Sequence, residues 1–165
     1  MIKSISYGKQ SINDDDIKSV IRVLKSDFIT QGPLVSKFEK KLSDFVGVKY
    51  AIVSNSATSS LILACKAMNL GKKDIVWTSA NTFVSSANCV LHCGASIDLV
   101  DININTGNIC LEDLSKKLFS AKKKKKLPSV LIPVHFAGQP TLQEEIWKLS
   151  KKYKFKIIED ASHSL

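Results

Sequence analysis

A short segment near the end of the sequence holds the side chains best suited to chemistry. It reads KIIEDASHSL, and in it Asp160 and then His163 follow an apolar run. An apolar strand that ends in an Asp delivers a charge to the carboxyl edge of an open α/β sheet, where such folds bind ligands. Taken singly, a ligand contact for Asp160 and an Asp that only caps the next helix explain the same residues equally well.

A polar turn of small residues, NSATSS over residues 55–60, is the second candidate. Small side chains let backbone N–H groups approach a ligand. Thr58 and Ser59 add hydroxyls at a predicted helix N-terminus, which attracts anions. The turn lacks the Gly-Lys-Ser/Thr of a P-loop. It therefore predicts either a phosphate site of another kind or a plain serine-rich helix cap.

Two further side chains follow predicted strands. Phe83 stands at the entry to a helix, where its ring can lie against a flat ligand. His135, before a GQP turn at residues 138–140, could also contact a ligand. Taken singly, a core Phe and a hydrogen-bonded His explain both. A phosphate cradle, an aromatic for a ring face and an acid for a ring nitrogen together describe a phosphorylated aromatic cofactor. Pyridoxal phosphate needs all three, because its protonated ring is the electron sink.

The elements that must position these groups alternate along the chain. Because helices separate the strands, we predict an α/β fold with a mostly parallel sheet and helices on both faces. Asn13 or Asp14 can cap the first helix, Gly47 can end the second, and Asn108 signals the start of the fifth. From apolar spacing we expect helices over residues 14–24, 35–45, 61–68, 82–91, 111–118 and 142–153, and buried strands over residues 50–53, 75–77, 96–100, 130–134 and 156–158.

Composition narrows the functional classes. The 165 residues suffice for one domain with a core, and no window is apolar and long enough to cross a bilayer. The start, MIKSISYGKQ, lacks the apolar stretch of a secretory signal, so we expect a cytoplasmic protein.

The net charge of +9 includes five consecutive lysines at residues 122–126. Binding of nucleic acid through this run is one interpretation. No aromatic or Arg interrupts the run, and Arg22 is the only arginine, so a solvated loop without a nucleic-acid partner is favoured. Cys89, His92 and Cys93 suggest a metal site only superficially, because no second ligand pair has matching spacing. Buried thiols and no metal are expected instead.

Several segments, read in order, match one known family. They are Tyr7, TQGP at residues 30–33, NSATS at 55–59, TFV at 82–84, GNI at 107–109 and EDASH at 159–163. With them the whole chain resembles the N-terminal half of the DegT/DnrJ/EryC1/StrS sugar aminotransferases, which have the PLP-dependent fold type I. The spellings NSATSS and EDASHSL are most similar to the branch that aminates UDP-linked 4-keto-6-deoxy-N-acetyl sugars on the route to pseudaminic acid.

The resemblance implies a role for each matching residue. Thr58 and Ser59 would contact the phosphate of pyridoxal 5'-phosphate, and Phe83 would stack on its ring. Asp160 would pair with the ring nitrogen, and His163 would reach the ring hydroxyl. The residues implied to face the nucleotide-sugar are Tyr7, Asp27, Phe28, Ile29, Thr30 and Ala57.

The implied reaction moves an amine, with glutamate as the expected donor, to C4 of the keto-sugar. It needs a Schiff-base lysine, which the family carries in a Ser-Phe-His-Pro-x-Lys-like segment that would follow residue 165. We therefore assign no catalytic residue. We expect residues 1–165 to be an N-terminal part with the start of the PLP-binding large domain, inactive alone and homodimeric when complete. The alternative is a non-enzymatic α/β phosphate- or nucleotide-binding module.

Overall fold

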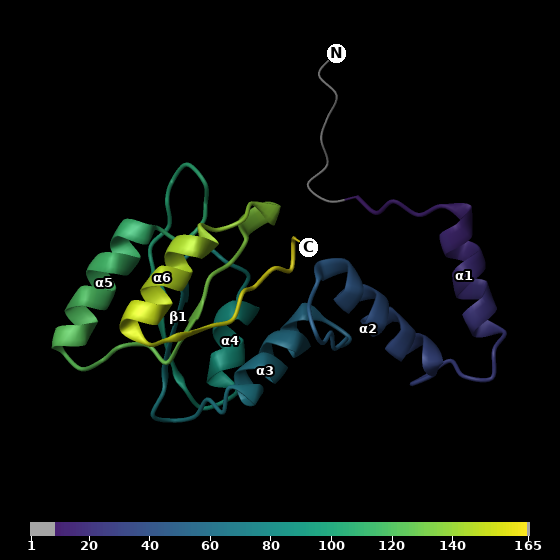
Figure 1. Cartoon of the computed structure of the whole chain (residues 1–165), viewed down its shortest axis with the longest axis horizontal. Coiled ribbons are helices and arrows are strands. Elements are labelled where there is room, and N and C mark those ends of the chain that lie inside the picture. The colour runs from purple at the N-terminus through teal and green to yellow at the C-terminus, as the bar shows by residue number, and fades with distance from the viewer. Residues whose placement is uncertain (1–8, 165) are drawn as a thin grey trace, which may run out of the picture. The chain divides into compact units, whose positions relative to one another are not determined.

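The chain divides into two compact units, Met1–Val53 and Ser54–Leu165. A computed structural model describes residues 9–164, and Figure 1 shows the elements in chain order. Each unit is described by itself. No helix within residues 9–164 combines the length and the apolar character needed to cross a membrane.

The first unit holds two helices, α1 (Asp14–Leu24) and α2 (Pro33–Val46). Asn13 caps α1 with its side chain and Asp16 completes a capping box, which confirms the predicted start. Gly47 ends α2 in the left-handed conformation at φ +70°, as predicted for a glycine cap. Local features of the sequence thus account for where α1 begins and where α2 ends.

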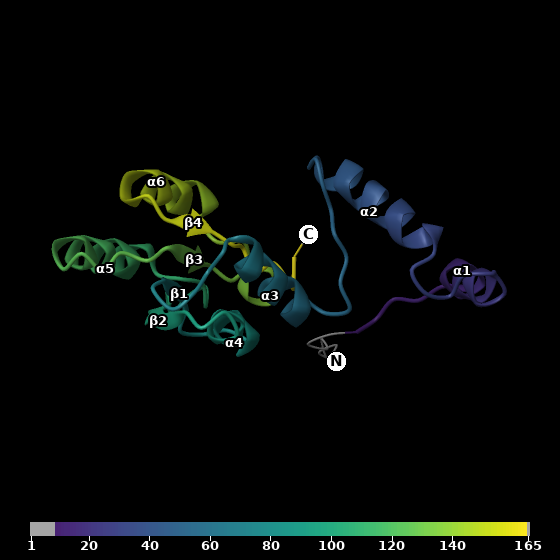
Figure 2. The same ribbon diagram turned by 90° about the horizontal axis from the view of Figure 1, so that it is seen from below.

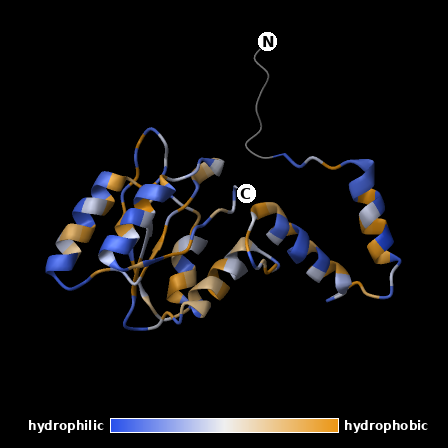
Figure 3. Ribbon diagram, viewed as in Figure 1, coloured by the Kyte–Doolittle hydropathy of each residue, from blue (hydrophilic) through white to orange (hydrophobic). Residues whose placement is uncertain are grey.

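The apolar stripes of these two helices face outward within their unit. Ser43 is the only buried residue among residues 9–53, and α1 buries none. Figure 3 shows the apolar residues in orange along both helices. The exposed stripe residues include Ile17, Val20, Ile21, Leu24, Val35, Phe38 and Phe45.

The second unit is a parallel sheet with helices on both faces. Its four strands lie in the order β2-β1-β3-β4, and each neighbouring pair is parallel. Figure 2 views this sheet nearly edge-on, with α3 and α4 on one side and α5 and α6 on the other. The elements are α3 (Ala57–Ala67), β1 (Ile75–Ser79), α4 (Ser85–Leu91), β2 (Ser96–Val100), α5 (Leu111–Lys123), β3 (Val130–Ile132), the short 3-10 helix η1 (Phe136–Gly138), α6 (Gln143–Tyr153) and β4 (Lys156–Ile157). The predicted α/β class is confirmed.

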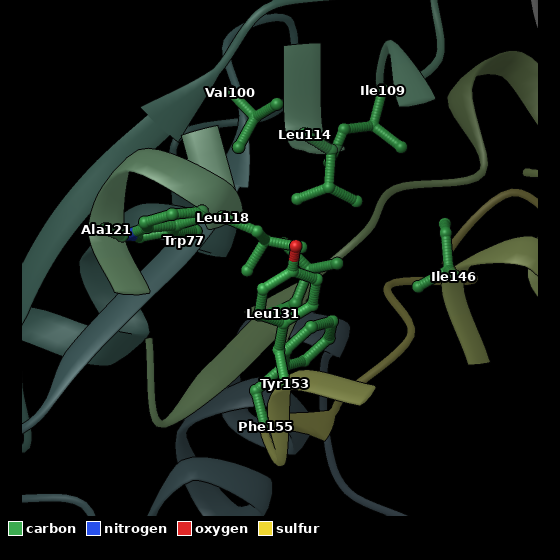
Figure 4. Packing of buried hydrophobic residues seen from close by; sticks show 10 residues of the cluster. All are labelled: Trp77, Val100, Ile109, Leu114, Leu118, Ala121, Leu131, Ile146, Tyr153 and Phe155. Carbon is green, nitrogen blue, oxygen red and sulfur yellow. The ribbon is translucent and has the colours of Figure 1, made fainter. Parts of the chain in front are cut away.

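Alternate residues of the central strands build two separate cores. Trp77 and Leu131 face α5 and α6, where they meet residues such as Leu118 and Tyr153 (Figure 4). The residues one position away face α3 and α4. That second core consists of Leu61, Cys65, Val76, Cys89, Val90, Ala95, Val130, Ile132 and Ile158. Burial on both faces explains why the first three residues of β1 and all of β3 read as continuous apolar runs.

The predicted buried strand at residues 50–53 is wrong. These residues form no strand, and Ile52 is 80% exposed. A strand needs a neighbour for its N–H and C=O groups, and within residues 9–164 this segment lies beside none. The amide of Val53 instead donates to the Glu39 carboxylate at 3.0 Å.

Other element boundaries shift for local reasons. α3 begins at Ala57, so most of the expected turn at residues 55–60 is the cap and first turn of the helix. α4 begins only at Ser85, and α5 continues into the lysine run as far as Lys123. Asn108 does not cap α5, because Cys110 occupies the cap position. β2 is more exposed than expected, since among residues 9–164 it is an edge strand with β1 as its one neighbour.

Candidate functional site

Asp160 lies where the ends of β3 and β4 meet, and the backbone holds it there. Its amide donates to the Pro133 carbonyl at 2.9 Å, and its carbonyl accepts the amide of His135 at 3.0 Å. It shares a sheet face with Ile158, two residues earlier, which packs toward α3 and α4. Asp160 is only 6% exposed, so its carboxylate is directed to the inner side of that helical layer.

Neutral donors hold the carboxylate of Asp160. Ser86, on α4, donates its hydroxyl to Oδ2 at 2.6 Å, across 74 residues of sequence. Ser162 donates its hydroxyl to Oδ1 at 2.6 Å and its amide to the same oxygen at 3.3 Å. These groups orient the acid without neutralising it. The arrangement suits a cationic group bound beside the carboxylate.

The N-terminus of α3 carries the hydroxyl-rich turn. Ser56 caps the helix by accepting the amide of Ser59 at 3.2 Å, and its hydroxyl lies 3.1 Å from the Ser59 hydroxyl. The amides of Ala57 and Thr58 belong to the first turn, where a helix supplies no acceptor of its own. A helix start of this kind can bind an anion such as a phosphate, so the cap interpretation and the phosphate interpretation are compatible here.

The first turn of α4 connects the two polar groups. The hydroxyl of Ser85 lies 2.8 Å from that of Thr58, on α3. The next residue, Ser86, bonds to Asp160. Two consecutive serines therefore tie the hydroxyl-rich turn and the buried acid to one rigid element. A ligand with a phosphate at one end and a cationic nitrogen at the other would meet both groups.

Phe83 is separated from α4 only by the cap residue Val84, and it is 72% exposed. The alternative of a core Phe is therefore wrong. An exposed ring beside Ser85 and Ser86 is available to stack on a flat ligand. His163 is also exposed. Its carbonyl oxygen would lie 2.9 Å from a Cβ added at Gly138, so the η1 turn supports the loop that carries it.

The buried histidine of the neighbouring segment does not join this site. His135 Nε2 lies 3.4 Å from Glu159 Oε2 and 3.5 Å from Gln143 Nε2. Glu159 follows Ile158 and precedes Asp160, so it faces the opposite layer. Of the two interpretations of His135, the hydrogen-bonded histidine is confirmed.

Asn108, expected as a helix start, instead fastens the η1 loop. Its side-chain amide donates to the carbonyls of Gln139 and Pro140 at 2.9 and 3.1 Å. Its carbonyl oxygen accepts the amide of Phe136 at 2.9 Å. One buried side chain thus satisfies three backbone groups of a loop that packs against the Asp160–Ser164 segment.

The expected sugar-facing residues fall in different places. Tyr7 lies outside the described residues. Asp27, Phe28, Ile29 and Thr30 form an exposed connection between α1 and α2 in the first unit, whereas Ala57 begins α3 in the second. The five cofactor residues Thr58, Ser59, Phe83, Asp160 and His163 all belong to the second unit.

Two cysteines lie behind the site, between α3 and α4. Cys65 and Cys89 are buried, as predicted, with their sulfur atoms 3.6 Å apart. The hydrogen bond from Cys65 lowers the pKa of Cys89, and the same bond, aided by burial, raises the pKa of Cys65. Cys93 and Cys110 are only half-buried.

The sequence alone does not identify Ser85 and Ser86 as residues of this site. Their signal was the spelling TFVSS, in which hydroxyls follow an aromatic at a strand-to-helix entry. Such serines are ordinary at helix starts. Only their contacts with Thr58 and Asp160 distinguish them.

Comparison with known proteins gives consistent matches. The family model described as the DegT/DnrJ/EryC1/StrS aminotransferase family matches residues 10–165. A UDP-4-amino-4,6-dideoxy-N-acetyl-beta-L-altrosamine transaminase from Campylobacter jejuni is 39% identical over 161 residues, which cover 98% of this chain and 42% of that protein.

Solved structures agree with the sequence matches. PseC from Helicobacter pylori, an aminotransferase involved in the biosynthesis of pseudoaminic acid, is 31% identical with a TM-score of 0.85, covering 99% of this chain and 43% of that one. The putative sugar aminotransferase Spr1654 from Streptococcus pneumoniae, in its PMP-form, is 27% identical with a TM-score of 0.85, covering 98% and 43%. The chain spans about two-fifths of the length of these relatives.

Proposed function

This chain belongs to the DegT/DnrJ/EryC1/StrS aminotransferase family, and we propose that it forms the N-terminal part of a PLP-dependent nucleotide-sugar aminotransferase. One observation carries the proposal. A buried carboxylate, which accepts hydrogen bonds from the neutral hydroxyls of Ser86 and Ser162, is linked through two consecutive serines to a hydroxyl-rich helix start. A carboxylate connected in this way to an anion-binding helix start fits a ligand that has a phosphate and a cationic ring.

The residues present fit pyridoxal phosphate, whose protonated ring supplies an electron sink when bound. The start of α3, with Thr58 and Ser59, would hold the phosphate. Phe83 would lie against the ring face. Asp160 would accept a hydrogen bond from the protonated ring nitrogen, and His163 would approach the ring hydroxyl. Each role uses a group that the contacts above leave facing the same helical layer or exposed beside it.

We propose a UDP-linked 4-keto-6-deoxy-N-acetyl sugar as the substrate. The Campylobacter relative is named for a UDP-linked 4-amino-4,6-dideoxy-N-acetyl sugar, and the Helicobacter relative is involved in the biosynthesis of pseudoaminic acid; both support this class. A spore coat polysaccharide biosynthesis protein from Bacillus subtilis, 35% identical, supports the wider role in surface polysaccharides. The segment Asp27, Phe28, Ile29 and Thr30, with Tyr7 and Ala57, would face the sugar.

Four finer points stay predictions: glutamate as amine donor, a homodimer, a cytoplasmic location and the inactivity of residues 1–165 alone. The last follows from the family's Schiff-base lysine, which the resemblance expects after residue 165. A turnover assay of this chain beside the complete family member that contains it tests that prediction. Turnover by residues 1–165 alone would contradict it.

A titration of the chain with pyridoxamine 5'-phosphate tests the proposed cofactor. The amine form is the better probe, because the aldehyde would react with the many surface lysines. Saturable binding that excludes inorganic phosphate competitively is expected. Preference for UDP or ATP, with no binding of pyridoxamine phosphate, would contradict the proposal and favour the nucleotide-binding module.

Two variants of the complete enzyme test the assigned roles. Asp160→Asn should abolish turnover while leaving the circular dichroism spectrum unchanged, because a neutral amide cannot hold the ring nitrogen in its cationic form. Phe83→Ala should weaken cofactor retention only about fivefold, since stacking contributes on the order of 1 kcal/mol. Near-normal turnover of Asp160→Asn would contradict the role of that acid.

A further inference from the structure

We propose that Ser86 is the positioning residue that fixes the carboxylate of Asp160 for a cationic ring nitrogen, with Thr82 orienting Ser86. The inference rests on the proposed cofactor. It adds two residues to which neither the motif nor the family match gives a role. The observations that carry it are the hydrogen bonds of Ser86 with Thr82 and with Asp160, and the packing of its helix into the core.

The two oxygens of Asp160 are held by different kinds of support. Oδ1 is bound by Ser162, which is an exposed residue of the same terminal loop, two positions further on. Oδ2 is bound at 2.6 Å by Ser86, which is fully buried in the first turn of α4. Cys89 and Val90, one turn further along α4, are buried in the core. Ser86 therefore connects the acid to the packed interior, whereas Ser162 lies on the exposed loop that follows the acid.

The directions of the hydrogen bonds follow from the number of protons. An ionised carboxylate only accepts, so the single hydroxyl proton of Ser86 points to Asp160. The hydroxyl of Thr82 lies 2.7 Å from that of Ser86. Because Ser86 has already used its proton, Thr82 must donate to it. The Phe83 carbonyl, at 3.1 Å, is the more distant acceptor for Ser86.

A directed chain thus runs from Thr82 through Ser86 to Asp160 Oδ2. Such a chain fixes the plane of the carboxylate, and each bond polarises the next. Bonds to an ionised acceptor are about twice as strong as neutral ones. A side chain that touches a cofactor must be held within a fraction of an ångström of its productive geometry. The residues that support it must themselves have fixed rotamers. Ser86 meets this requirement, since its rotamer is set by a donor on one side and an acceptor on the other.

A merely structural role for Ser86 makes a different prediction. If the hydroxyl only satisfies a buried oxygen, its removal should weaken every ligand of the site equally. If it positions Asp160, removal should weaken only a ligand whose ring carries a nitrogen. Pyridoxamine 5'-phosphate and its 1-deaza analogue, in which a carbon replaces the ring nitrogen, share the phosphate and ring face and separate the two cases.

The experiment measures the dissociation constants of both ligands by calorimetry, for the unsubstituted chain and for three variants. Ser86→Ala should weaken pyridoxamine phosphate about tenfold, as expected for a lost hydrogen bond to a charged group, and the deaza analogue less than twofold. Thr82→Val keeps the shape of the side chain and should produce a smaller loss in the same direction. Ser79→Ala is the matched control: Ser79 is a buried serine whose hydroxyl finds no partner within residues 9–164, and its removal should change neither ligand.

The outcomes separate the inference from the function on which it rests. If the unsubstituted chain binds neither ligand, or both equally, the proposed function is overturned and the inference with it. If the unsubstituted chain prefers pyridoxamine phosphate and Ser86→Ala keeps that preference unchanged, the inference alone is overturned. Equal weakening of both ligands would likewise overturn it. Should Ser86→Ala fail to fold by circular dichroism, Thr82→Val decides: a selective loss supports the inference, and no loss overturns it.

Discussion

The two units of the molecule contain helices of the same kind with opposite outcomes. α1 in the first unit and α5 in the second both carry an apolar stripe on a charged helix. Leu114 and Leu118 of α5 are fully buried against the sheet, whereas Leu24 of α1 is 66% exposed. Local signals therefore suffice to form a helix, whereas burial of the apolar stripe of that helix depends on a partner surface.

The proposed cofactor site follows the same division. All of its residues belong to the unit that has a sheet and two cores. There, contacts between distant segments hold Asp160, Ser86 and Thr58 in one place. The segment proposed to face the sugar, residues 27–30, belongs to the first unit, where Ser43 is the only buried residue among residues 9–53. Of the residues proposed to face the sugar, residues 27–30 thus lie in the first unit, whereas Ala57 lies in the second with the proposed cofactor residues.

The largest effect on stability is expected from truncating a buried side chain of the sheet. Leu131, on the central strand β3, is fully buried, so Leu131→Ala should lower the free energy of unfolding by about 2–5 kcal/mol. Leu24→Ala, at an exposed leucine of the first unit, should change it by less than about 0.5 kcal/mol. Urea unfolding followed by circular dichroism measures both. A similar loss of stability for Leu24→Ala would contradict the difference between the two units, because it would mean that the apolar stripe of α1 is covered in solution.

A smaller effect is expected from a buried polar side chain. Asn108→Ala removes three hydrogen bonds to the backbone of residues 136–140 and should cost about 2–3 kcal/mol, because buried groups lose their partners. Hydrogen exchange should show faster opening of residues 135–140. Asn105→Ala, at an exposed position of the same loop, is the control and should be nearly neutral. Equal effects of the two variants would remove Asn108 from the groups that support the site.

Two glycines with similar φ angles, one in each unit, differ in the space available for a Cβ atom. Gly47 has φ +70° with open space where a Cβ would be, so Gly47→Ala should cost only about 1 kcal/mol of backbone strain. Gly138 has φ +82°, and an added Cβ would meet the His163 carbonyl oxygen at 2.9 Å. Gly138→Ala should therefore cost about 2–3 kcal/mol, strain and displacement together. Thermal unfolding compares them, and an equal cost would mean that the loop carrying His163 yields freely.

The smallest effect is a pH dependence within the second unit. The Ser129 hydroxyl, at 2.5 Å, and the Gly71 amide, at 2.9 Å, lower the pKa of Asp74. A lowered pKa in the folded state gives stability that is present above the ordinary value of 3.8 and is lost as the pH falls through the folded value. Asp74→Asn should flatten the fall in stability below that value, and Ser129→Ala should flatten it in part. An unchanged acid profile in both variants would contradict this origin.

Much of the candidate site could be predicted from residue types alone. Thr58 and Ser59 were recognisable because serine and threonine at a helix start leave their hydroxyls beside free amides. Asp160 was recognisable because it follows an apolar strand. Ser86 was not, since its partner is 74 residues away and nothing in the spelling TFVSS identifies that partner. The strand expected at residues 50–53 failed for the related reason that an apolar run does not reveal whether a neighbouring strand exists.

By itself, the sequence determined the features that depend on residues within about one helical turn of each other. These are the cap at Asn13, the left-handed end at Gly47 and the apolar runs of β1 and β3. Only the tertiary structure decided the strand order β2-β1-β3-β4, the use of Asn108 as a loop support and the meeting of Ser86 with Asp160. The physical reason is range: caps and periodicity are satisfied within a segment. Sheet pairing and buried hydrogen bonds need partners that are adjacent only after the layers have packed.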